Sequence, residues 1–140
     1  MNLQCLRWMV AAALLLTAFV TACQRSSPER YPEDTVDREY AIERYRELGC
    51  SGCHQLDLVN PEPRPGPTHN GMGVTAQRRI ADPSYTGAAT TPADYLEESI
   101  VNPPAYLVPG YDRSRFVMPA FTTLGERELD ALVQLLFQAR

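Results

Sequence analysis

The 140-residue sequence contains no lysine, so its 13 basic residues are all arginine, against 17 acidic residues. A lysine-rich surface therefore cannot exist, and the acidic balance favours a basic or apolar partner rather than a nucleic acid. Alternation of polar and apolar residues, which would indicate β-strands, is also missing. The mostly apolar run at residues 8–20 is shorter than the ~20 residues of a membrane-spanning helix. A cleaved leader is therefore favoured over an uncleaved membrane anchor.

Residues 1–22 have the order of an export signal, with a basic residue, an apolar run and then small residues. The end of this segment, Val20-Thr21-Ala22-Cys23, resembles the lipobox of bacterial lipoproteins. The resemblance implies that Cys23 is the first mature residue and carries the lipid anchor; the alternative is a buried or free cysteine. We predict a flexible, polar tether at 23–35 and one folded domain at 36–140.

Helical periodicity occurs in three stretches of the mature chain, at residues 36–48, 92–101 and 126–140. Between them the chain is rich in proline and glycine, particularly at 61–73 and 103–110. Helices this short make a poor core, and loops this long normally have a function or wrap a ligand. We therefore expect an all-α fold whose core is completed by a large apolar cofactor. The expected core-facing positions are Ala41, Ile42, Tyr45, Leu48, Leu129, Leu132, Val133, Leu136 and Phe137.

The motif with the most specific chemistry is Cys50-Ser51-Gly52-Cys53-His54. In a Cys-x-x-Cys-His motif, the two thiols bond covalently to haem and the histidine becomes an axial iron ligand. A thioredoxin-type redox site would need a neighbouring βαβ pattern, which is absent. A zinc site would need a second pair of ligands, which no other mature cysteine supplies. The motif therefore predicts one covalently bound haem c.

Three residues are candidates for the second axial ligand: Met118, Met72 and His69. Met72 and His69 follow His54 closely, which leaves little chain to reach the opposite side of a haem. Met118 is far along the chain and precedes Pro119, which stiffens the backbone at that point. We therefore predict Met118 as the second ligand, in an electron carrier whose two axial positions are both filled.

The order of these features resembles the class I cytochrome c family over residues 36–140. The resemblance implies three to five short helices wrapped around the haem. Gly66-Pro67-Thr68 is similar to the family's Gly-Pro segment, which implies that the carbonyl of Pro67, with Pro65 as the alternative, accepts a hydrogen bond from His54.

The same resemblance implies the groups that bind the haem propionates. Ser84-Tyr85-Thr86 is similar to the loop whose tyrosine hydroxyl reaches a propionate, and Arg78 or Arg79 occupies the neighbourhood of the family's propionate-binding arginine. The sequence departs from the family's pattern in two ways. The loop at 112–116 is longer, and no tryptophan follows Trp8. The hydrogen bond that many relatives form between a tryptophan and a propionate must therefore come from another residue.

Residues 95–111 are similar to the cytochrome domain fused to subunit II of haem-copper oxidases, and to lipoprotein cytochromes that accompany alternative complex III. The resemblance implies a lipid-anchored carrier of single electrons on the periplasmic side of a bacterial membrane. Its partners would be a quinol-oxidising complex or a dehydrogenase and a terminal oxidase. The alternatives are a fixed subunit of such a complex and, less favoured, a haem enzyme with an open iron. We expect neither catalysis nor a small-molecule substrate.

Overall fold

The computed structural model describes residues 38–111 and 116–140, all within the unit Asp34–Arg140. This part of the chain is helical, as expected, and contains no β-strand, only an isolated bridge between Leu56 and Asn60. No helix within it is both long enough and apolar enough to cross a membrane. The predicted leader, the tether and Cys23 lie outside the described residues. The helices are α2 (Arg38–Glu47), α3 (Cys50–Cys53), α4 (Met72–Ile80), α5 (Pro92–Val101), the 3-10 helix η2 (Pro103–Ala105) and α6 (Glu126–Gln138).

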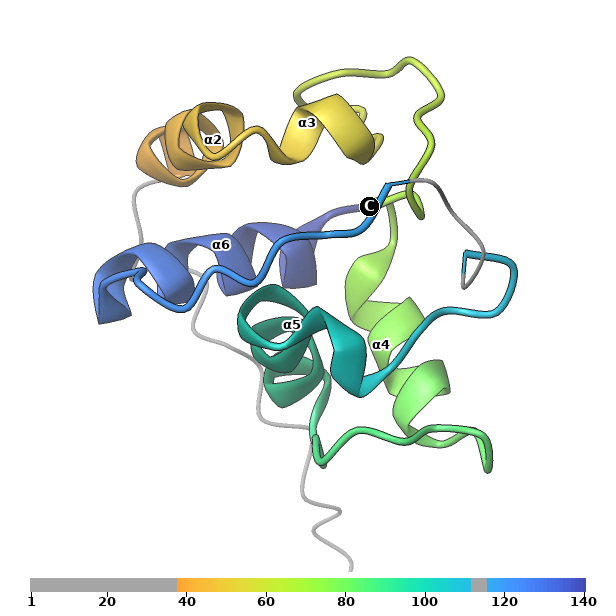
Figure 1. The fold of residues 1–140 in the computed structure, drawn as a ribbon. Coiled ribbons are helices and arrows are strands. Elements are labelled where there is room, and N and C mark those ends of the chain that lie inside the picture. Colours follow the sequence, from red (N-terminus) through yellow and green to blue (C-terminus); the bar gives the residue numbers. More distant parts are fainter. Residues whose placement is uncertain (1–37, 112–115) are drawn as a thin grey trace, which may run out of the picture. The chain divides into compact units, whose positions relative to one another are not determined.

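The C-terminal helix α6 is the centre of the packing, because it contacts α2, α4 and α5 (Figure 1). All residues from 131 to 136 are buried. Six consecutive buried positions cover more than one face of a helix, so α6 is enclosed on several sides. The sequence predicted a single apolar face on this helix. It did not predict the burial of Ala131, Gln134 and Leu135.

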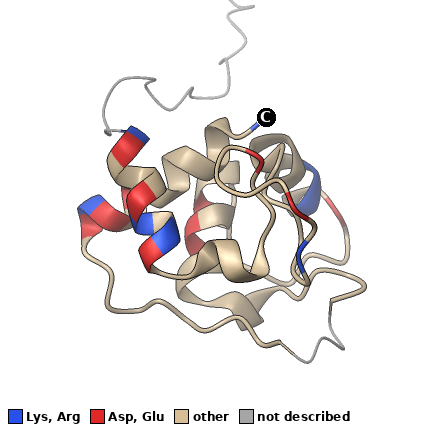
Figure 2. Ribbon diagram, turned by 90° about the horizontal axis from the view of Figure 1, so that it is seen from above, with Lys and Arg blue, Asp and Glu red and all other residues tan. Residues whose placement is uncertain are grey.

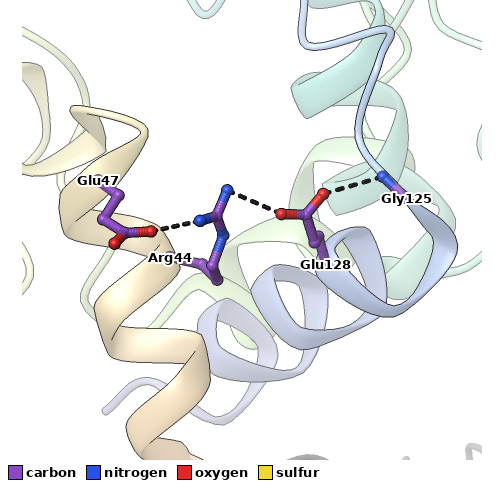
Figure 3. Close-up of polar contacts among 4 residues, drawn as sticks. All are labelled: Arg44, Glu47, Gly125 and Glu128. Atoms are coloured by element: carbon purple, nitrogen blue, oxygen red, sulfur yellow. Dashed lines mark hydrogen bonds and ion pairs between the residues drawn. The ribbon is translucent and has the colours of Figure 1, made fainter.

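Helix α2 is bound to the start of α6 by charged contacts. Figure 2 shows acidic and basic residues close together on these two helices. The guanidinium of Arg44 bridges Glu47 of its own helix and Glu128 of α6, with 2.7 Å between Nη2 of Arg44 and Oε1 of Glu128 (Figure 3). The other oxygen of Glu128 accepts a hydrogen bond from the backbone N–H of Gly125, at 3.0 Å. Glu128 therefore caps α6 and binds it to α2 at the same time.

Helix α5 begins and ends at the residues that the sequence predicted, 92 and 101. The side chain of Thr91 accepts a bond from the N–H of Asp94, and the carboxylate of Asp94 accepts one from the N–H of Thr91. Pro92 occupies the first helical position, where its missing N–H costs nothing. The helix ends at Val101, just before the proline pair that opens η2.

Helix α4 was not predicted, because its first residues belong to the glycine-rich stretch and because Val74 and Thr75 are weak helix formers. Tertiary contacts stabilise it instead. Met72 and Ala76 are buried one turn apart, and a Cβ at Gly73 would lie 2.5 Å from the carbonyl oxygen of Phe137. Only glycine permits this approach of α4 to the end of α6.

Candidate functional site

The helices and the loops between them line an apolar cavity of about 510 Å³, partly open to solvent, which we call the central cavity. Its lining is drawn from residues in the ranges 45–54, 66–79, 95–111, 116–121 and 132–136. Cavities of 300–1,000 Å³ with mostly apolar walls and a few polar groups are typical binding sites for small molecules and cofactors. Leu96, Ile100, Leu132 and Leu136 form part of the apolar wall.

Both cysteines of the motif line the central cavity from α3, a single helical turn that follows Gly49. Residues three apart in a helix lie on one face, so the two thiols are presented to the same space. Burial raises the pKa of the Cys50 thiol to about 11, against an opposing backbone hydrogen bond and with a smaller rise from Cys53. Thioredoxin-type cysteines have a lowered pKa, so Cys50 differs from them in the direction of its shift.

His54 directly follows α3 and lines the cavity with only 8% of its surface exposed. Its Nδ1 lies 2.8 Å from the carbonyl oxygen of Pro67, the residue that the family resemblance implied; Pro65 is exposed and does not line the cavity. A carbonyl can only accept, so Nδ1 carries the proton. Burial lowers the pKa of His54, the bond to Pro67 opposes this, and the charge of Arg79 lowers it further. In the resulting neutral ring, Nε2 keeps a lone pair that can bind a metal.

The loop before α4 returns to the motif at Gly66, whose N–H donates to the carbonyl of Cys53 at 2.7 Å. A Cβ at Gly66 would lie 2.6 Å from that same oxygen and 2.9 Å from Cε1 of His54. These contacts leave no room for a side chain. The close approach brings Pro67 within hydrogen-bonding distance of His54.

We expect Gly66→Ala to destabilise the fold by about 1–3 kcal/mol, because the new methyl group overpacks the loop against the motif. Gly52→Ala is the matched control: Gly52 lies in α3, and a Cβ there would meet nothing within 4 Å. In the control, the urea concentration at the unfolding midpoint should be unchanged or slightly higher than in the wild type. Urea unfolding curves of the two variants measure the difference, and equal midpoints would contradict the close packing described for Gly66.

All three candidates for the second axial ligand line the central cavity, but in different settings. Met118 is half-buried, in the non-helical segment that precedes α6. Met72 is 3% exposed and is fixed at the first turn of α4. The ring of His69 is stacked on that of His54, with 4.0 Å between centroids and an angle of 12° between the ring planes. His69 therefore lies beside His54 rather than across the cavity from it.

Of the three residues that the resemblance implied as partners of the propionates, only Arg79 lines the central cavity. Arg79 lines the cavity and donates to the hydroxyl of Tyr95 at 2.7 Å, whereas Arg78 is exposed and does not line it. Tyr85 does not line the cavity either: its hydroxyl donates to the carboxylate of Glu98. That carboxylate also accepts a bond from the N–H of Ala88, so it holds the loop containing Tyr85 against α5.

Several cavity residues were not predicted to be at the site. Tyr95 and Tyr106 line the cavity, and their ring centroids are 6.3 Å apart. Tyr45 was predicted only as a core residue, yet its hydroxyl is 2.9 Å from Nδ1 of His69. Periodicity indicates that such residues are buried, but it cannot indicate which buried group each hydroxyl meets.

Comparison of the chain with protein-family models, with curated proteins and with solved structures found no significant match.

Proposed function

We propose that the chain is a monohaem c-type cytochrome with the class I cytochrome c fold, and that it carries single electrons. One arrangement carries the proposal: two cysteines and a histidine that keeps a lone pair on Nε2 lie together on the wall of an apolar cavity of about 510 Å³. Cys50 and Cys53 would hold the haem covalently, and His54 would bind its iron. Haem supplies one-electron oxidation and reduction at its iron.

The volume of the central cavity favours a large apolar ligand. A cavity of about 510 Å³ lies within the 300–1,000 Å³ range of sites that bind small molecules and cofactors, and its walls are mostly apolar. Covering apolar surface stabilises a protein by about 25 cal/mol per Å². A ligand that covers these walls is therefore expected to stabilise the fold.

Arg79 gives the cavity a place for a negative charge. Within the described part of the chain, Arg79 contacts the hydroxyl and the ring of Tyr95, both neutral, and forms no ion pair with a carboxylate. A guanidinium on an apolar wall favours an anionic partner, since unpaired buried charge is costly. A haem propionate is such a partner, and Arg79 fits that role better than Arg78 or Tyr85.

Met118 remains the proposed second axial ligand. Because His69 is stacked on His54, its ring could not reach the opposite side of a metal bound to His54 without a rearrangement. Met118 lies in a non-helical segment, so its side chain can be placed without bending a helix. With a thioether and an imidazole as ligands, both axial positions are filled, which supports electron transfer rather than catalysis.

The absorption spectrum of the purified protein tests the proposed function. We expect covalent haem, a low-spin ferric spectrum with a sulfur-to-iron charge-transfer band in the far red, and no rapid binding of carbon monoxide. A high-spin ferric spectrum with rapid binding of carbon monoxide would instead indicate a haem enzyme with an open iron. Absence of covalent haem after expression with a c-type haem attachment system would exclude the proposal.

The proposed working position is the periplasmic face of a bacterial membrane, between a quinol-oxidising complex or dehydrogenase and a terminal oxidase. The basis for it is the lipobox-like segment ending at Cys23, which lies outside the described residues. We expect intact-mass and peptide mass spectrometry of the membrane-extracted protein to find a lipid-modified N-terminus at Cys23. Cys23→Ala should release the protein from the membrane while it keeps its haem. A mature N-terminus at any other residue contradicts the anchor.

A further inference from the structure

The ring of His54 is stacked on the ring of His69, a residue to which the proposed function gives no role. His69 is 9% exposed, and its ring is nearly parallel to that of His54, at a centroid distance of 4.0 Å. Tyr45, fully buried, is within 2.9 Å of Nδ1 of His69 and within 3.5 Å of the carbonyl oxygen of His54. Two imidazole rings and one phenol therefore form a continuous buried group next to the Cys-x-x-Cys-His motif.

The stack is also fixed through the backbone. The N–H of His69 donates to the carbonyl of Gln55, the residue after His54, at 2.8 Å. The hydroxyl of Thr68 approaches the same carbonyl at 3.4 Å. The backbone that carries His69 is therefore hydrogen-bonded to the backbone next to His54, and these bonds fix the position of His69 together with the side-chain packing.

The bond from Nδ1 of His54 to Pro67 restrains the plane of the imidazole ring, but a single hydrogen bond tolerates a range of ring angles. The torsion about the Cβ–Cγ bond, which rotates the ring, has a broad energy profile, so some freedom in the ring angle remains. A flat group stacked on the ring face removes this freedom, because rotation would drive ring atoms into the neighbour. His69 supplies the flat group, and the hydrogen bond to Tyr45 keeps it in place.

We propose that His69, held by Tyr45, is a positioning residue that fixes the plane in which the His54 ring is presented to the iron. This inference rests on the proposed function, since it assumes that His54 binds haem iron. It adds a role for two residues that bind neither the haem covalently nor its iron. The consequence is a single orientation of the axial imidazole, which electron paramagnetic resonance of the ferric protein reports through the principal g values.

The test compares haem-loaded variants of the full chain. His69→Leu removes the flat ring and Tyr45→Phe removes the hydroxyl that holds it, so we expect both to shift or broaden the principal g values. In the double variant Tyr45→Phe with His69→Phe, an aromatic ring remains and both partners of the Tyr45–His69 hydrogen bond are removed together, so neither is left unpaired. This double variant should return the g values towards those of the wild type.

Leu135→Ala is the control for general destabilisation, because Leu135 is buried in α6 but does not line the central cavity. It should lower the thermal midpoint and leave the g values unchanged. Unchanged g values in both His69→Leu and Tyr45→Phe would overturn the inference while leaving the proposed function intact. If His69→Leu does not fold, unchanged g values in Tyr45→Phe alone would overturn the inference. A wild-type chain without covalent haem would overturn the proposed function, and this inference would fall with it.

Discussion

Replacing both Cys50 and Cys53 with alanine is expected to abolish covalent haem attachment, the largest effect that we predict for any substitution in this chain. Each thiol would form one thioether bond, and both thiols lie on the wall of the central cavity, three residues apart on α3. No other cysteine occurs within the described residues, so none there can replace them. Each single variant should keep at most one bond to the haem.

Haem staining of a denaturing gel measures the result, because only covalently bound haem migrates with the chain. Ser51→Ala is the matched control: Ser51 lies between the two cysteines and should leave attachment unchanged. Covalent haem in the double alanine variant would contradict the proposed role of the motif. The double variant should also be less stable than the wild type, because the central cavity would lose the ligand proposed to be held there.

The proposed role of Met118 as second axial ligand predicts that Met118→Ala opens one coordination position of the iron. The far-red charge-transfer band should disappear and carbon monoxide should bind rapidly. The reduction potential should fall, because the thioether ligand raises it. Met118 is half-buried in a non-helical segment, so we expect a smaller loss of stability than for a fully buried methionine.

Met72→Ala is the comparison that distinguishes a ligand from a core residue, because Met72 also lines the cavity but is 3% exposed at the start of α4. Truncation of a buried methionine costs about 2–5 kcal/mol. We therefore expect the Met72 variant to be less stable and to keep the far-red band. If the band is lost in the Met72 variant and kept in the Met118 variant, the assignment of the second ligand is wrong.

The helices that the sequence predicted are those with their own local signals. Helix α5 has a capping residue, a proline at its first position and a proline pair after its end, and it occupies the predicted residues 92–101. Helix α6 was predicted at 126–140 and ends at Gln138. Helix α4 has no such signal, because its close approach to α6 at Gly73 depends on a residue more than sixty positions away. A contact of this kind cannot be found from a local pattern.

The site divides in the same way. The spacing within Cys50-Ser51-Gly52-Cys53-His54 is local, so the sequence alone brings two thiols and an imidazole onto one short segment. The resemblance also pointed to Pro67, which lies beside His54 because Gly66 has no side chain to prevent the approach. It did not separate Arg79 from Arg78, since neighbouring positions on a helix face different directions and only the packing of α4 decides which one lines the cavity.

The sequence by itself determined the helical class, the bounds of α5 and the Cys-x-x-Cys-His motif, because each depends on residues within a few positions of one another. Only the tertiary structure decided that His69 is stacked on His54, that Tyr45 is bonded to His69, and that Tyr85 is held by Glu98 away from the cavity. These contacts join side chains from separate segments, and their geometry follows from how α2, α5 and the loop before α4 pack together. Hydrogen-bond partners of buried polar groups are set by that packing, which no local sequence pattern specifies.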